Sequence, residues 1–189
     1  MVKTEIVFLL DRSGSMMGKE AELISGYNSF ILQHTTPDDS CIVTTVLFDD
    51  AYEILFDAVP AQNAQLKKQQ YYVRGFTALC DAIGRAIHLV GERHAAMTKS
   101  KRPKVYFVVS TDGYENASRE YNKGMIKQLI EKQQRKHAWE FLFIGCDIDA
   151  VTSADELGIP SENSYACSSE DENFFCDILN VMNSKIESR

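Results

Sequence analysis

The chain has 189 residues, of which 44% are hydrophobic, and its formal net charge is −7 at pH 7. This length and composition suit one folded domain over residues 1–189. Ten acidic residues and no Lys or Arg fall within residues 138–184, so this flank repels nucleic acid. The first apolar run is too short for a secretory signal or a membrane span, and we expect a cytoplasmic protein with no membrane partner.

The pattern of apolar residues predicts strands that alternate with helices. Apolar runs indicate six strands, at 3–10, 41–48, 52–59, 104–110, 139–144 and 162–166. Helical spacing predicts helices at 19–34, from about 77, at 118–136, at 150–157, and a last one that carries Phe175, Ile178, Leu179, Met182 and Ile186. The short connection at 49–50 is typical of a hairpin and makes the third strand an antiparallel edge. We therefore expect an α/β fold, with a doubly wound, mostly parallel six-stranded sheet and helices on both faces.

Oxygen-bearing side chains follow the first predicted strand. Asp11, Ser13 and Ser15 stand at alternate positions in a loop that Gly14 and Gly18 allow to turn tightly. Carboxylate and hydroxyl oxygens are ligands that suit Mg²⁺, Mn²⁺ or Ca²⁺. Taken alone, the same residues are better explained as a turn that caps the next helix.

Two later segments place similar side chains at another helix start and another strand end. Thr77 stands at the entry of a predicted helix, where its hydroxyl could cap the helix or reach an ion. Asp112 follows the buried strand at 104–110, and so occupies the same edge of the sheet as Asp11. In open α/β sheets, ligands bind at this carboxyl edge.

These segments together resemble the von Willebrand factor A domain. The matching motifs are Asp-x-Ser-Gly-Ser-Met-x-Gly at 11–18, Gly-x-Thr-Ala-Leu-x-Asp-Ala at 75–82 and Thr-Asp-Gly at 111–113. The resemblance covers nearly the whole chain and is to a small intracellular member of bacterial type. It implies a metal-ion-dependent adhesion site at which a carboxylate of a partner protein completes the coordination of the ion. Carried over to this sequence, the metal ligands are Asp11, Ser13, Ser15, Thr77 and Asp112, and Mg²⁺ is the expected ion, with Mn²⁺ or Ca²⁺ as alternatives.

Six further residues are expected to support or surround this site: Asp81, Gly113, Met16, Phe76, Tyr114 and Glu115. Asp81 lies one turn into the predicted helix, where its carboxylate could support the loop by hydrogen bonding. The side chains of Met16, Phe76, Tyr114 and Glu115 would surround the ion and could contact a partner. For Met16 and Phe76 the alternative is that they pack beneath their own loops.

The function expected from these residues is metal-dependent protein binding without catalysis. A metal-dependent hydrolase or phosphoryl-transfer enzyme is one alternative, but Ser13 stands where a haloacid-dehalogenase-type phosphatase needs a second Asp. Ser15 lacks the spacing of a nucleophile elbow, and all four histidines lie outside the three motif segments. A scaffold with a purely structural metal site is the other alternative. The residues do not identify the partner.

The five cysteines include no Cys-x-x-Cys pair, so we expect reduced thiols, with Cys41, Cys80 and Cys146 as small buried hydrophobic residues.

Residues 99–104 form a basic segment just before a strand, at the amino edge of the sheet and away from the proposed metal. A solvated connection explains this segment better than a phosphate site.

Overall fold

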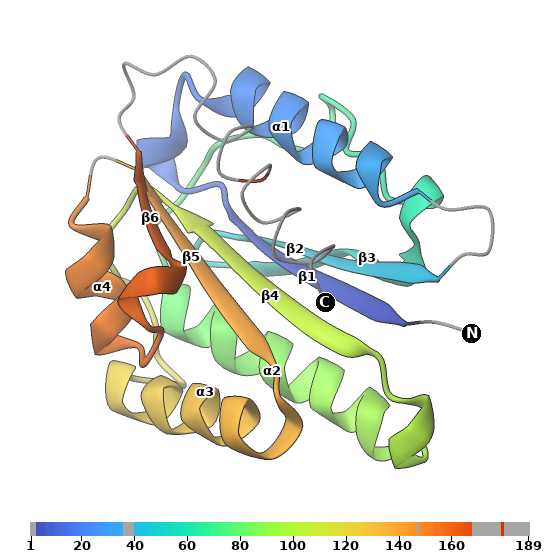
Figure 1. The fold of residues 1–189 in the computed structure, drawn as a ribbon. Coiled ribbons are helices and arrows are strands. Elements are labelled where there is room, and N and C mark those ends of the chain that lie inside the picture. The colour runs from blue at the N-terminus through green and yellow to red at the C-terminus, as the bar shows by residue number, and fades with distance from the viewer. Residues whose placement is uncertain (1–2, 36–39, 147, 168–178, 180–189) are drawn as a thin grey trace.

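One sheet organises the part of the chain that the computed structural model describes, which is residues 3–35, 40–146, 148–167 and 179 (Figure 1). Its strand order is β3-β2-β1-β4-β5-β6. The strands are β1 (Thr4–Asp11), β2 (Cys41–Phe48), β3 (Tyr52–Pro60), β4 (Lys104–Thr111), β5 (Glu140–Cys146) and β6 (Ser164–Cys167). All neighbours pair in parallel except β2 and β3, so the mostly parallel sheet with one antiparallel edge strand is confirmed.

Helices cover both faces of this sheet. Helix α1 (Glu20–Gln33) lies on one face, whereas α2 (Leu79–Ala95), α3 (Lys123–His137) and α4 (Ala150–Glu156) lie on the other (Figure 1). Successive residues of β1 point to opposite faces, so Phe8 packs with Tyr27 and Phe30 of α1, while Val7 and Leu9 join the core under α2 and α3. Among the described residues, none of the helices has the length and apolar character needed to cross a membrane.

The helix predicted at 118–136 begins later than expected. Helix α3 starts at Lys123 because the side chain of Asn122 accepts a hydrogen bond from Met125 N at 3.0 Å and caps the helix. The residues before it are held in a loop, since the backbone N–H groups of residues 119–121 donate to the carboxylate of Asp81. The predicted last helix lies outside the described residues except for Leu179, which is buried in the core on the α1 face.

The prediction of reduced thiols is wrong at Cys146. Cys41 and Cys80 are free and buried, and burial raises the pKa of each thiol to about 12. Cys146 is buried as predicted but is disulfide-bonded. The spacing of the cysteines gave no indication of this bond, because a disulfide depends on which residues the fold brings together.

A buried ion pair links the ends of β1 and β2. Arg12 and Asp49 both have fully buried side chains, and Arg12 Nε donates to Asp49 Oδ2 at 2.9 Å. Burial opposes ionisation of Asp49, but hydrogen bonds from Arg74 and Ala51 N, together with the charge of Arg12, lower the pKa of its carboxyl overall. The two strand ends are therefore held together by a pair of charges that have little access to water.

Replacing Arg12 with Met should lower the free energy of unfolding by about 3 kcal/mol, because Asp49 would keep its charge without its buried partner. Urea denaturation followed by circular dichroism measures this loss. Arg74→Met is the control: Arg74 contacts the same oxygen of Asp49 at 2.7 Å but is half exposed, and its loss should cost less. A larger effect at Arg74 than at Arg12 would contradict this account.

Candidate metal centre

The candidate ligands meet at the point where the strand order reverses. The chain runs outward from β1 through β2 to β3, then returns to β4 on the other side of β1. Asp11 is the last residue of β1 and Asp112 directly follows β4, and these two strands pair in parallel. Both carboxylates therefore lie at the carboxyl edge, at the topological switch point where ligands of such sheets bind.

The carboxylate of Asp11 is fully buried and fixed by two hydrogen bonds. Its Oδ1 accepts from Ser13 N at 2.7 Å, and its Oδ2 accepts from the hydroxyl of Thr111 at 2.6 Å. Burial raises the pKa of Asp11 to about 6, since the hydrogen bonds from Thr111 and Ser13 offset only part of the lost hydration. Among the described residues no cation pairs with Asp11, so a positive ion nearby would favour its charged form.

Three hydroxyl groups gather beside this carboxylate. Thr77 Oγ1 donates to Ser13 Oγ at 2.9 Å, and the hydroxyls of Ser13 and Ser15 lie 3.2 Å apart. Gly113 makes the cluster possible, because a Cβ there would lie 2.9 Å from Thr77 Oγ1 and 3.0 Å from Ser15 Oγ. The structure thus brings together, from two loops and a helix entry, the residues that the sequence placed in three separate motifs.

Asp112 completes the set with an oxygen that lacks a partner. Its Oδ2 accepts from Lys19 Nζ at 2.6 Å, whereas its buried Oδ1 accepts no hydrogen bond from any described residue. A buried carboxylate oxygen without a partner is costly, and a bound cation would satisfy it. The described residues contain no cluster of three or more His, Cys, Asp or Glu that could hold a metal, so any cation site here depends on hydroxyl oxygens.

Two carboxylates hold the loop after β4 against helix α2. Asp81 accepts from the backbone N–H groups of residues 119, 120 and 121, and Glu115 Oε2 accepts from Cys80 N at 2.8 Å at the start of α2. Asn116 Oδ1 accepts from Thr77 N at 2.9 Å, which fixes the position of Thr77. Glu115 is therefore engaged with α2 rather than directed toward a partner.

Exposed aromatic side chains border the site. Phe76 and Tyr114 are 68% and 61% exposed, and both line the hollow of about 440 Å³ that contains Ser13, Thr77 and Asp112. Met16 is buried in the core on the α1 face, as the alternative for this residue predicted, while Met17 is exposed. Of the four residues expected to surround the ion, the aromatic pair is thus the one placed to contact a protein bound over the hydroxyl cluster.

Three residues of the site were not anticipated. Lys19 reaches it from the residue before α1, and Asn116 from the loop after β4. Nothing in their local sequence marks them as partners of Asp112 and Thr77. Thr111 stands in the Thr-Asp-Gly motif, so the sequence marked it as a residue near the site. Its hydrogen bond to Asp11 joins residues that are 100 positions apart in the sequence. Each of these contacts is between segments that are distant in the chain.

Replacing Asp11 with Asn should stabilise the protein at pH 7 in the presence of a chelator, by about 1–3 kcal/mol, because the neutral amide avoids burial of a charge. The amide can keep both contacts, accepting from Ser13 N and donating to the hydroxyl of Thr111. Thermal and urea denaturation of both proteins measure the change. A loss of stability in the variant would show that the buried charge is already compensated.

The fold and this group of side chains define a doubly wound α/β domain with a candidate cation site at its switch point. The sequence matches the von Willebrand factor type A domain over residues 5–180, and the chain belongs to this family. Domains of this family are generally interaction modules rather than enzymes. No curated protein matches the chain.

Solved structures share the fold at low sequence identity. The von Willebrand factor domain of the type V pili tip protein Mfa5 from Porphyromonas gingivalis is 10% identical, with a TM-score of 0.74 over 98% of this chain and 96% of that one. The pilus adhesin SpaC from Lactobacillus rhamnosus GG is 13% identical, with a TM-score of 0.72 over 98% of this chain and 30% of that one.

A third similar structure is proximal thread matrix protein 1 from the mussel byssus with a zinc-occupied MIDAS motif. It is 14% identical, with a TM-score of 0.68 over 96% of this chain and 46% of that one. This chain thus spans less than half of the mussel protein. At such identities the likeness shows the fold, and the binding properties of these proteins are their own.

Proposed function

We propose that this domain binds a divalent cation through Asp11, Ser13, Ser15, Thr77 and Asp112, and that the ion holds a carboxylate of a partner protein. The observation that carries the proposal is the buried, unpartnered Oδ1 of Asp112 beside the hydroxyl cluster around Gly113. Mg²⁺ is the proposed ion, with Mn²⁺ or Ca²⁺ as alternatives, and a ligand set made only of oxygens suits all three. Support for a divalent ion also comes from the mussel protein, whose MIDAS motif holds zinc.

The charges of the proposed ligands explain why a partner carboxylate would bind. Asp11 and Asp112 together neutralise a divalent cation, whereas the three hydroxyls supply oxygens without further negative charge. An ion held in this way still attracts an anion into a coordination position left to water. Phe76 and Tyr114 offer exposed aromatic surface around that position, so the partner would gain apolar contacts as well. We propose that the domain acts by binding and carries out no catalysis.

The cytoplasmic location stays a prediction. It rests on the shortness of the first apolar run. The disulfide at Cys146 gives it no support, because disulfides persist mainly in oxidising compartments.

Calorimetric titration of the chelator-stripped protein with Mg²⁺, Mn²⁺ and Ca²⁺ tests the cation site. We expect saturable binding at one site, with a loss of at least about tenfold in affinity for Ser13→Ala and for Asp112→Asn, since each removes one oxygen ligand or its charge. Ser118→Ala is a matched control, because its hydroxyl contacts Glu115 rather than the cluster. Equal binding by all four proteins, or none by the wild type, would contradict the proposal.

Replacing Lys19 is expected to strengthen cation binding, whereas replacing a ligand weakens it. The ammonium group of Lys19 lies 2.6 Å from Asp112 Oδ2, so a bound cation would compete with it for the carboxylate and displace it. Lys19→Met should therefore bind Mg²⁺ about three- to tenfold more tightly in the same titration. Weaker binding by this variant would show that Lys19 supports the site instead of competing for it.

A further inference from the structure

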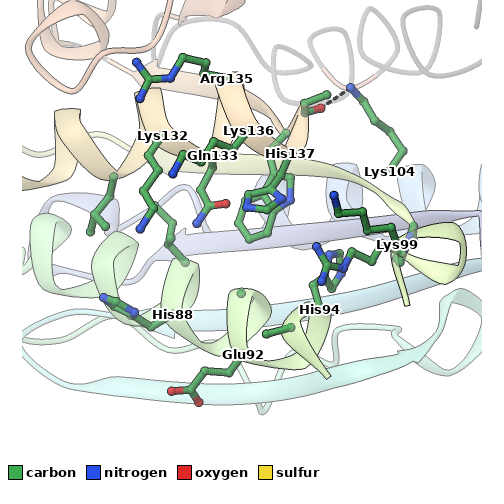
Figure 2. Close-up of a pocket in the computed structure, with 18 residues that line it drawn as sticks. His88, Glu92, His94, Lys99, Lys104, Lys132, Gln133, Arg135, Lys136 and His137 are labelled. Atoms are coloured by element: carbon green, nitrogen blue, oxygen red, sulfur yellow. Dashed lines mark hydrogen bonds between the residues drawn. The ribbon is translucent and has the colours of Figure 1, made fainter. Parts of the chain in front are cut away.

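A second hollow lies at the opposite, amino edge of the sheet, between helices α2 and α3 (Figure 2). This α2–α3 groove has a volume of about 1030 Å³ and includes the ends of both helices and the start of β4. Leu129 supplies apolar surface to it, and the largely buried Ile87 and Trp139 form part of its lining. The groove shares no residue with the candidate metal centre, so what binds in it is independent of the proposed cation.

The groove is strongly basic although the whole chain is negative. Six Lys and Arg side chains line it, against Glu92 as the single acidic one: Lys99, Arg102, Lys104, Lys132, Arg135 and Lys136. Within the described part of the chain, Lys104 is the one that forms an ion pair, with Glu140 at 3.0 Å. The negative ends of helix dipoles explain basic residues in a last turn, such as Arg135 and Lys136, but Lys99, Arg102 and Lys132 lie outside those turns.

Two buried polar atoms in the groove lack partners. Gln133 is only 9% exposed, and its Oε1 accepts no hydrogen bond from any described residue. Arg102 Nε is also buried, and it donates to none of them. Figure 2 shows Lys132 and Gln133 directed from α3 toward α2, with Lys99 entering from the other end. A ligand that offers both an N–H donor and an oxygen acceptor would satisfy the two atoms, as the backbone of a peptide does.

We propose that the α2–α3 groove binds an extended acidic segment of a partner protein. Its carboxylates would pair with Lys99 and Lys132, its backbone would bond to Gln133, and an apolar side chain would pack on the partly exposed Leu129. A compact phosphate fits less well, because it offers oxygen acceptors to Arg102 Nε but no N–H donor to Gln133 Oε1. The domain would then carry a protein-binding surface at each edge of its sheet.

Fluorescence offers a direct test, because Trp139 is the only Trp of the chain and lines the groove. The probe is a short synthetic peptide of glutamate and leucine, titrated into the full chain at low ionic strength with a chelator present. We expect a saturable change in the emission of Trp139, and affinity lowered by at least about tenfold in the double variant Lys99→Glu, Lys132→Glu. Lys67→Glu with Lys68→Glu is the control of equal charge, since both side chains are exposed and lie outside the groove.

A variant that leaves the net charge unchanged separates recognition by hydrogen bonding from general electrostatic attraction. Gln133→Leu should weaken peptide binding several-fold, and this loss should persist at high salt, where the effect of the lysines fades. If the charge-reversal variant does not fold, Lys99→Gln with Lys132→Gln replaces it. No binding by the wild type, an equal loss in the control, or pyrophosphate binding as tight as that of the peptide would overturn the proposal. The chelator keeps this result separate from the success or failure of the cation site.

Discussion

The parallel pairing of β1 with both β2 and β4 is the constraint on which the rest of this structure depends. It makes β1 a central strand whose two faces are covered by helices, which requires the continuous apolar run at its centre. It also brings the ends of three strands to one edge, so that Asp11, Asp49 and Asp112 become neighbours of the same switch point. Without this pairing, the hydroxyls of Ser13 and Thr77 would have no reason to meet.

The negative charges of the acidic side chains at this edge must be compensated, by positive side chains or by hydrogen bonds. Asp49 has a buried guanidinium beside it, while the carboxylate of Asp11 receives only hydrogen bonds. Asp112 is intermediate, with the ammonium group of Lys19 on one oxygen and nothing described on the other. This uneven compensation supports the proposal that a cation binds between Asp11 and Asp112. At the amino edge of the sheet the imbalance of charge is reversed, since more basic than acidic side chains line the α2–α3 groove.

Much of the fold follows from local sequence. The apolar runs of β1 and β4 are long enough to identify buried strands, and the hairpin residues at 49–50 identify the antiparallel edge. The start of α3 could not be predicted in the same way, because the hydrogen bonds of Asp81 to the preceding loop are tertiary. The candidate site, too, could be predicted only in part from local sequence. Its motif residues stand at the ends of predictable elements, whereas Lys19 and Asn116 reach it from segments that become neighbours only in the folded chain.

Crystals soaked with Mn²⁺ would test the central claim most directly, by anomalous diffraction. The account predicts one anomalous peak at about 2 Å from Asp112 Oδ1 and from the hydroxyl oxygens of Ser13 and Ser15. It also predicts that the ammonium group of Lys19 moves away from Asp112. A fully soaked crystal without a peak at the switch point, or with a peak elsewhere and Lys19 still bound to Asp112, would contradict the account.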